Sequence, residues 1–295
     1  MKKNIEQEKA IAQLEGPVIL ISCPGSGKTT TLLRRINHML EVGIPPKKIL
    51  MITFTKAAAQ EMSVKFKKKF GEPNGITFST IHALCLKILM TYGGLSAENI
   101  IKTSDQWKFL LETARKCQSV CDPAKAAGNF QMLYSAAMNN RMSPSEVNPK
   151  DIKGISRKDF LFMSEEYRRM KERTGYIDFD DMLVKAYELM TGNLQVLRQL
   201  RERWDYIQVD EYQDVNYLQR DLVYLLAGEK KNLCVAGDDD QSIYRFRGAR
   251  PEIMLNFPKD FPQAHVFCIS TNYRSYPAII GCAGKPVSYT HLTLP

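Results

Sequence analysis

A glycine-rich segment near the N-terminus carries the side chains of a phosphate-binding loop. Glycines let the backbone curl so that several N–H groups face a phosphate, at the positive end of the following helix. Lys28 can reach the β- and γ-phosphates of a nucleoside triphosphate, and the Thr29 hydroxyl can ligate Mg²⁺. The strict pattern has Gly at position 22, where this chain has Ser, but the expected strand-loop-helix context is present. The residues assigned to ATP binding are Ser22, Cys23, Pro24, Gly25, Ser26, Gly27, Lys28, Thr29 and Thr30.

An acidic pair follows another apolar run, at residues 206–209. Asp210 can hold Mg²⁺ through water, and Glu211 can polarise an attacking water as a general base. Such a pair on its own usually marks a solvated strand end. Together with the phosphate-binding loop, it predicts hydrolysis of a nucleoside triphosphate.

Strands and helices alternate around these groups. Short apolar runs predict strands, at residues 17–21, 49–54, 76–79, 206–209, 233–236 and 265–269. Helical patterns cover residues 28–40 and 56–70, and a third helix is expected to start after an N-cap at Thr80 and run to Tyr92. This alternation predicts an α/β fold, with a parallel sheet covered by helices on both faces.

The segment from about residue 95 to 175 breaks the alternation. It has no convincing strand, and it has apolar residues at helical spacing. We therefore expect an all-helical insertion, with 15 Lys and Arg against 10 Asp and Glu over residues 85–177. The stripes interpreted as core are Trp107, Leu110, Leu111, Ala114 and Cys117, and Phe160, Met163, Tyr167 and Met170.

Composition narrows the class of protein. The 295 residues have 44% hydrophobic content and a formal net charge of +9, which suggests an anionic partner, most commonly nucleic acid, and leaves open a basic surface without a partner. The seven cysteines lack zinc-knuckle spacing and are interpreted as reduced cytosolic thiols. No apolar run is long enough to span a membrane, and residues 1–10 do not form a secretory signal, so we expect a cytoplasmic protein with no membrane partner.

Several further motifs, in this order, resemble the UvrD/Rep/PcrA-like helicases of superfamily 1. They are Thr53-Phe54-Thr55-Lys56-Ala57-Ala58-Ala59, Ser79-Thr80-Ile81-His82, Phe179-Asp180-Asp181-Met182-Leu183, Asp210-Glu211-Tyr212-Gln213-Asp214, residues 237–249 and Asn272-Tyr273-Arg274-Ser275. The resemblance covers nearly the whole chain. It implies a P-loop RecA-like parallel sheet with an all-helical insertion domain, and ATP-driven movement, 3′ to 5′, on single-stranded or tailed duplex DNA.

The resemblance also implies roles for residues outside the phosphate-binding loop. Gln7 would read the adenine edge and Tyr273 would stack on the adenine. Gln241 would sense the γ-phosphate and couple it to DNA, and Arg274 would neutralise charge on the transferring phosphoryl group.

Candidate DNA contacts follow from the same resemblance. Phe54 would contact a base, and Thr80 and His82 would contact the DNA backbone. The full set is Phe54, Thr55, Thr80, His82, Tyr244, Arg245, Phe246 and Arg247. Aromatic residues interleaved with cations suit stacking on single-stranded bases. The lysines in residues 65–69 are interpreted instead as a solvated helix face.

The resemblance implies two RecA-like domains with ATP between them, of which this chain holds the first. We expect an ATPase domain at 1–84 and 178–271, a helical domain at 85–177 and the start of a second RecA-like domain at 272–285. Residues 286–295 resemble the translation of a sequencing adapter and are expected to be non-native. With the second domain absent, we expect Tyr273 and Arg274 to have no packed partner, and Lys28 to lie unpacked on a surface loop.

Two other classes of function stay open on this sequence. One is the motor subunit of a helicase–nuclease, and the other is a DNA-binding module that uses ATP as a switch without unwinding. A small-molecule kinase is disfavoured because Asp210, Glu211 and Gln241 form a hydrolysis constellation with no evident acceptor site.

Overall fold

The computed structural model describes residues 4–72, 74–150, 152, 154–238, 241 and 250–275. Its centre is a six-stranded sheet in which every strand pair is parallel, with the order β3-β2-β4-β5-β1-β6. The strands are β1 (Val18–Ser22), β2 (Ile49–Thr53), β3 (Thr77–Thr80), β4 (Tyr206–Val209), β5 (Leu233–Gly237) and β6 (His265–Ile269). The predicted α/β class is confirmed, and each predicted strand lies within one residue of its observed bounds.

Alternating side chains of the strands enter two separate cores, one on each face of the sheet. On β1, Ile19 and Ile21 enter one core while Val18 and Leu20 enter the other. The second core is closed by α1 (Ile5–Ala12), α2 (Lys28–Glu41) and α3 (Lys56–Phe70). The first is closed by α4 (Ile81–Tyr92), α8 (Phe179–Gly192), α9 (Leu194–Arg203), α10 (Tyr217–Ala227) and α11 (Pro251–Asp260). Strands with both faces covered explain the continuous apolar runs in the sequence.

Side-chain caps set the start of the helices nearest the sheet edge. The Thr55 hydroxyl accepts from the Ala58 N–H at 3.1 Å, and the Thr80 hydroxyl accepts from the Ala83 N–H at 3.1 Å, as expected for Thr80. Asp178 forms a capping box with Asp181 at the start of α8. These caps fix where the chain turns from strand into helix on this side of the molecule.

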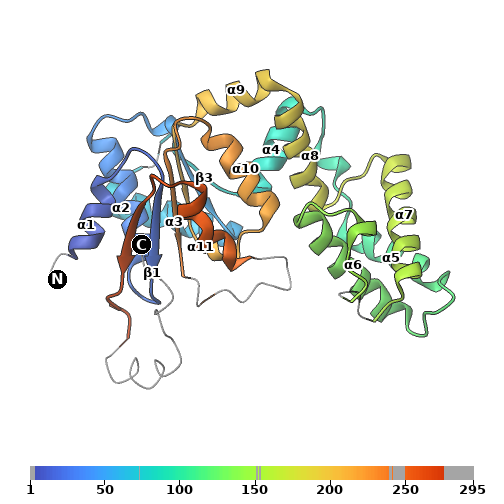
Figure 1. Cartoon of the computed structure of the whole chain (residues 1–295). Helices are drawn as coiled ribbons and strands as arrows, with labels where there is room; N and C mark the ends of the chain where they lie inside the picture. Colours follow the sequence, from blue (N-terminus) through green and yellow to red (C-terminus); the bar gives the residue numbers. More distant parts are fainter. Residues whose placement is uncertain are drawn as a thin grey trace.

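A group of helices stands away from the sheet in Figure 1: α5 (Thr103–Arg115), α6 (Pro123–Asn139) and α7 (Arg157–Thr174). Their core is separate and draws its buried side chains from residues 101–170. The expected boundary at residue 84 falls inside α4, whose buried side chains belong to the core under the sheet. Short 3₁₀ turns occur at η1 (Pro46–Lys48), η2 (Ala97–Asn99), η3 (Pro144–Glu146) and η4 (Tyr212–Asp214).

One expected core residue of these helices is at the surface. Phe160, Met163, Tyr167 and Met170 are buried as predicted, but the Trp107 side chain is 38% exposed. The residues of α5 that are buried are Leu110, Thr113 and Ala114, and Trp107, one turn before Leu110, is not among them. Spacing alone identifies the face of a helix but not how far along the helix its partner reaches.

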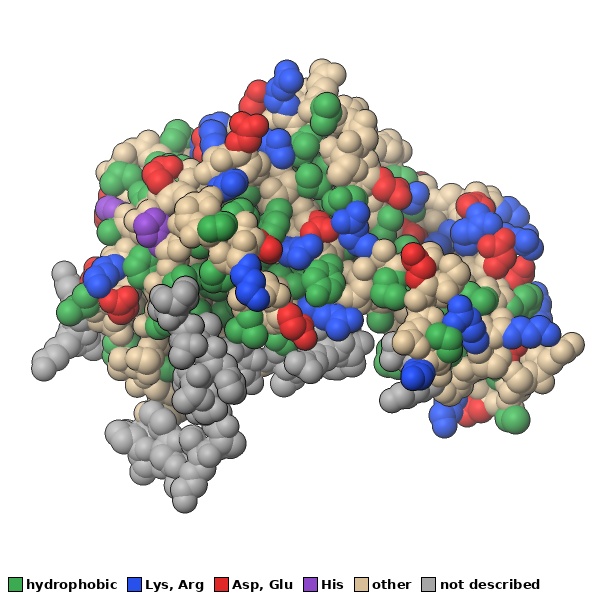
Figure 2. Space-filling model, in the orientation of Figure 1, with side chains coloured by type: hydrophobic (Ala, Val, Ile, Leu, Met, Phe, Trp, Pro, Cys, Tyr) green, Lys and Arg blue, Asp and Glu red, His purple; other side chains and the backbone are tan. Residues whose placement is uncertain are grey.

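The lysines of residues 65–69 lie on a solvated helix face, as predicted. The four lysines of residues 65–69 are exposed, and Lys65 and Lys67 pair with Glu61 and Glu72. On the face drawn in Figure 2, basic and acidic side chains of the described residues are interspersed. Within the described part of the chain, every helix is too short or too polar to cross a lipid bilayer.

Candidate active site

The phosphate-binding loop follows β1 at the carboxyl end of the sheet. Gly25 (φ 70°) and Gly27 (φ 86°) both take the left-handed backbone conformation that favours glycine, and Gly27 is the N-cap of α2. The Ser22 hydroxyl donates to the Gly237 carbonyl at the end of β5 at 3.0 Å, so serine ties the loop to a neighbouring strand. Because Gly27 is the N-cap, α2 begins directly after the loop, and the N-terminus of a helix favours a bound phosphate.

Lys28 and Thr29 meet the acidic pair at this edge. Lys28 Nζ lies 2.5 Å from Glu211 Oε2 and 3.9 Å from Asp210 Oδ1. The Thr29 hydroxyl donates to Asp210 Oδ2 at 3.3 Å. The prediction that Lys28 lies unpacked is wrong: its side chain is 12% exposed, because β4 and β1 end at the same sheet edge and bring the carboxylates to it.

The pKa values of the two carboxylates are shifted in opposite directions. Burial raises the pKa of Asp210 to about 6, with Lys28 acting against that rise and Glu211 adding to it. Burial also acts on Glu211, but the charge and hydrogen bond of Lys28 outweigh it and lower its pKa. Glu211 is thus held ionised, as a base must be. Asp210 and Thr29 present hard oxygen atoms beside each other, which fits the ligand preference of Mg²⁺.

Glu211 has an unusual backbone conformation for its residue type. Its φ of 53° and ψ of 44° are left-handed, and it directly precedes η4. A non-glycine residue in this region costs on the order of 1–3 kcal/mol and is held there only by its surroundings. The turn directs the Glu211 carboxylate toward Lys28, a feature that no pattern in the sequence indicates.

Gln213, which was not among the predicted site residues, also contacts Glu211. Its Nε2 donates to Glu211 Oε2 at 2.9 Å, and its Oε1 accepts from the Asp238 N–H at 3.0 Å. Gln241 Nε2 donates to Asp238 Oδ2 at 2.5 Å. Gln241, the expected γ-phosphate sensor, is therefore connected to Glu211 through Asp238 and Gln213. The only signal for Gln213 in the sequence is its place within Asp-Glu-Tyr-Gln-Asp.

The expected adenine residues lie on the other side of the loop. Gln7 Nε2 donates to the Ser26 carbonyl at 2.8 Å, and Asn4 Nδ2 donates to the Tyr273 hydroxyl at 3.3 Å. The Tyr273 N–H donates to the Gly25 carbonyl at 2.9 Å. The structure thus brings Gln7 and Tyr273 to the phosphate-binding loop.

The expectation that Tyr273 and Arg274 have no packed partner is wrong. A Cβ atom on Gly25 would lie 2.6 Å from Arg274 Cβ, so the segment sits directly against the loop. Asn272 Oδ1 accepts from the Arg274 and Ser275 N–H groups and holds the turn. The charge of Arg274 also contributes to the lowered pKa of Glu211. Close packing at Gly25 therefore holds this segment against the phosphate-binding loop.

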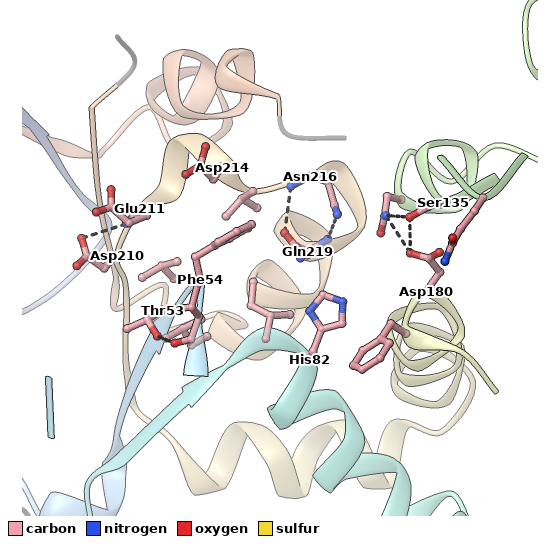
Figure 3. Close-up of a pocket in the computed structure, with 18 residues that line it drawn as sticks. Thr53, Phe54, His82, Ser135, Asp180, Asp210, Glu211, Asp214, Asn216 and Gln219 are labelled. Atoms are coloured by element: carbon pink, nitrogen blue, oxygen red, sulfur yellow. Dashed lines mark hydrogen bonds between the residues drawn. The ribbon is translucent and has the colours of Figure 1, made fainter. Parts of the chain in front are cut away.

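Some of the expected DNA residues line a cavity of about 630 Å³ (Figure 3). Phe54, Thr55 and His82 border it, with Asp210 and Glu211 at one end and Ser135 and Asp180 at the other. Burial lowers the pKa of His82, whose ring packs against Phe179. Thr80 caps α4 and does not line the cavity. Tyr244, Arg245, Phe246 and Arg247 lie outside the described residues, as do residues 276–295.

Comparison with known proteins agrees with this geometry. A family model described as the UvrD/REP helicase N-terminal domain matches residues 3–262. The chain belongs to the UvrD/REP helicase family. The family resemblance that the motifs predict is thereby confirmed.

Individual relatives match along almost the whole of this chain. YjcD of Bacillus subtilis (strain 168), provisionally named an ATP-dependent DNA helicase, is 35% identical over 289 residues, 95% of this chain and 37% of its own length. The ATP-dependent DNA helicases PcrA of Staphylococcus aureus (strain Mu50 / ATCC 700699) and of Staphylococcus epidermidis (strain ATCC 35984) are each 34% identical, over 96% and 97% of this chain. The chain spans about 40% of the length of these PcrA proteins.

Proposed function

We propose that this chain is the N-terminal, nucleotide-binding part of an ATP-dependent DNA helicase that moves 3′ to 5′ on single-stranded or tailed duplex DNA. The observation that carries the proposal is the meeting of Lys28, Thr29, Asp210 and Glu211 at one edge of the sheet. The relatives named as helicases add support. The six described cysteines are free thiols, which suits the cytoplasm.

In the proposed reaction, the loop N–H groups and Lys28 bind the phosphates of ATP. Thr29 and Asp210 would hold Mg²⁺, which neutralises phosphate charge when bound. Glu211 is the proposed general base: Gln213, whose hydrogen bond also lowers its pKa, stays beside it when Lys28 turns to the phosphates, so the ionised carboxylate can accept a proton as water attacks the γ-phosphate. When Lys28 turns to the phosphates, it leaves Glu211 Oε2, which loses one of its two donors, so the carboxylate can accept from that water instead.

The nucleoside is proposed to lie between Gln7 and Tyr273, which both contact the loop. An amide offers a donor and an acceptor to the adenine edge. Arg274, whose charge contributes to the lowered pKa of Glu211, would meet the transferring phosphoryl group. Gln241 would report the γ-phosphate to the DNA site through Asp238.

DNA is proposed to run across the cavity bordered by Phe54, Thr55 and His82. An aromatic ring and partly apolar walls suit a base more than a phosphate, and the carboxylates at the two ends repel the DNA backbone from the interior. We place Thr80, as the cap of α4, at the rim rather than within the cavity.

A strand-displacement assay of the full-length protein tests this function. Duplexes with a 3′ tail or a 5′ tail are compared in the presence of ATP. We expect unwinding of the 3′-tailed duplex only. Hydrolysis that single-stranded DNA stimulates without any strand displacement would instead assign the chain to an ATP-switched DNA-binding protein.

A further inference from the structure

Gln213 joins the polar ends of two neighbouring strands. It lies in η4, two residues after Glu211, and is 2% exposed. One side of its amide donates to Glu211 Oε2 at 2.9 Å, and the other accepts from the Asp238 N–H at 3.0 Å. Asp238 in turn accepts from Gln241. Because Lys28 pairs with the same Glu211 oxygen, a continuous series of contacts runs from Lys28 to Gln241.

Gly237 leaves the space that this amide occupies. A Cβ atom there would lie 2.6 Å from Gln213 Oε1, 2.7 Å from Met254 Sδ and 3.2 Å from the Gln213 backbone nitrogen. Its φ is not left-handed, so close approach, rather than backbone conformation, requires glycine at this position. The end of β5 is therefore shaped around the Gln213 side chain.

Glu211 Oε2 has two donors, Lys28 Nζ and Gln213 Nε2. In the proposed reaction Lys28 turns to phosphate, and the carboxylate then keeps Gln213 as a donor. A partly buried carboxylate needs such a donor to hold its orientation. The same amide also accepts from the Asp238 N–H, so one side chain connects Glu211 to the residue after β5.

We propose that Gln213 is a positioning residue that holds Glu211 in place during hydrolysis and couples that position to Asp238 and Gln241. The inference rests on the proposed function. A glutamine amide supplies a donor and an acceptor at once, whereas a glutamate at this position would supply only acceptors and a methionine neither. Gln213→Glu therefore removes the bond to Glu211 alone, and Gln213→Met removes both bonds.

Gln213→Glu and Gln213→Met in the full-length protein test this role. Three quantities are measured: ATP affinity, kcat without DNA and kcat with saturating single-stranded DNA. Both variants should lower kcat with DNA about 10- to 100-fold, because a small misplacement of a reacting group has an effect of this size. ATP affinity should stay within about 2-fold, since Gln213 does not reach the loop. Gln213→Glu keeps the acceptor for the Asp238 N–H and should retain the stimulation by DNA, which Gln213→Met should lose.

Gln208→Met is the matched control. Gln208 is a fully buried glutamine of β4 whose amide donates to the Leu32 carbonyl at 3.3 Å. It should leave kcat and the DNA stimulation unchanged. Wild-type kcat in both Gln213 variants would overturn the proposal, and so would parallel losses of ATP affinity, kcat and melting temperature, which indicate a purely structural role. Lys28→Ala distinguishes failure of the positioning role from failure of the proposed function. If Lys28→Ala abolishes hydrolysis while the Gln213 variants match wild type, only the positioning role of Gln213 fails.

Discussion

Lys28 Nζ lies 2.5 Å from Glu211 Oε2, so the lysine proposed to bind phosphate and the carboxylate proposed to act on water are paired with each other. The pair joins the first residue of α2 to the residue before η4, across the edge of the sheet. It keeps a partly buried carboxylate ionised, since Lys28 is the main group that lowers the pKa of Glu211. In the proposed function, phosphate would compete for the same ammonium group, which would link ATP binding to release of the base.

Lys28→Ala should abolish ATP hydrolysis in the full-length protein while the fold is kept. The variant removes a charge that stabilises the transition state, an effect of about 3–4 kcal/mol in comparable sites. It also removes the partner that lowers the pKa of Glu211. Phosphate release measured with and without DNA checks the prediction. Lys87→Ala, which removes an exposed lysine of α4, is the control and should hydrolyse ATP normally. Normal turnover in the Lys28 variant would remove the lysine from the mechanism.

Asp180→Asn should stabilise the protein more at pH 7.5 than at pH 4.5. Burial, with the nearby charge of Asp178, raises the pKa of Asp180 from 3.8 to about 6, despite donors from Ser135 and Asn139. The folded state therefore binds this proton more tightly than the unfolded state, and stability falls as pH rises from about 4 to about 6. This pKa shift corresponds to a change of at most about 3 kcal/mol in the free energy of unfolding.

Thermal unfolding at the two pH values measures this difference. The asparagine keeps an acceptor for Ser135 and Asn139 but cannot ionise. Asp105→Asn, in the exposed first turn of α5, is the control and should shift the melting temperature equally at both pH values. An Asp180 variant that loses stability at pH 7.5 would show that the ionised carboxylate stabilises the contact between α6 and α8.

Phe54→Ala should weaken binding of single-stranded DNA by about 1–3 kcal/mol, the usual contribution of one stacked base. Phe54 is half-buried at the wall of the proposed DNA cavity. The affinity of wild type should also fall steeply with salt, because bound phosphates release their counterions. Fluorescence anisotropy across a salt series measures both effects. Phe70→Ala, at the far end of α3, is the partly buried control. Equal DNA affinity in wild type and the Phe54 variant would place the bases elsewhere.

The strand ends and the acidic pair could be predicted from sequence for a simple reason. In a parallel sheet all carboxyl ends lie at one edge, so polar residues after strands meet there whatever the strand order. The order itself could not be predicted, because apolar runs do not specify which strands are neighbours. The left-handed backbone of Glu211 and the burial of Gln213 could not be predicted either, because both depend on the close approach of β4 and β5 rather than on a local sequence pattern.

The docking of Tyr273 and Arg274 was missed for a related reason. The segment can dock because Gly25 has no Cβ atom. From the sequence, Gly25 was predicted only to bind phosphate. The exposure of Trp107 shows that burial could not be predicted from helical spacing either. Helical spacing gives the orientation of a side chain, whereas burial depends on the extent of the partner surface.

The most direct test of the account is Glu211→Gln, assayed for ATP binding and for ATP turnover in the same preparation of the full-length protein. Glutamine keeps the shape of the side chain but cannot accept a proton from water. We predict ATP affinity close to wild type, because Lys28 and the loop are intact, and a fall in DNA-stimulated turnover of about 100-fold or more. Turnover at the wild-type rate, or an equal loss of affinity and turnover, would contradict the assignment of Glu211 as the base.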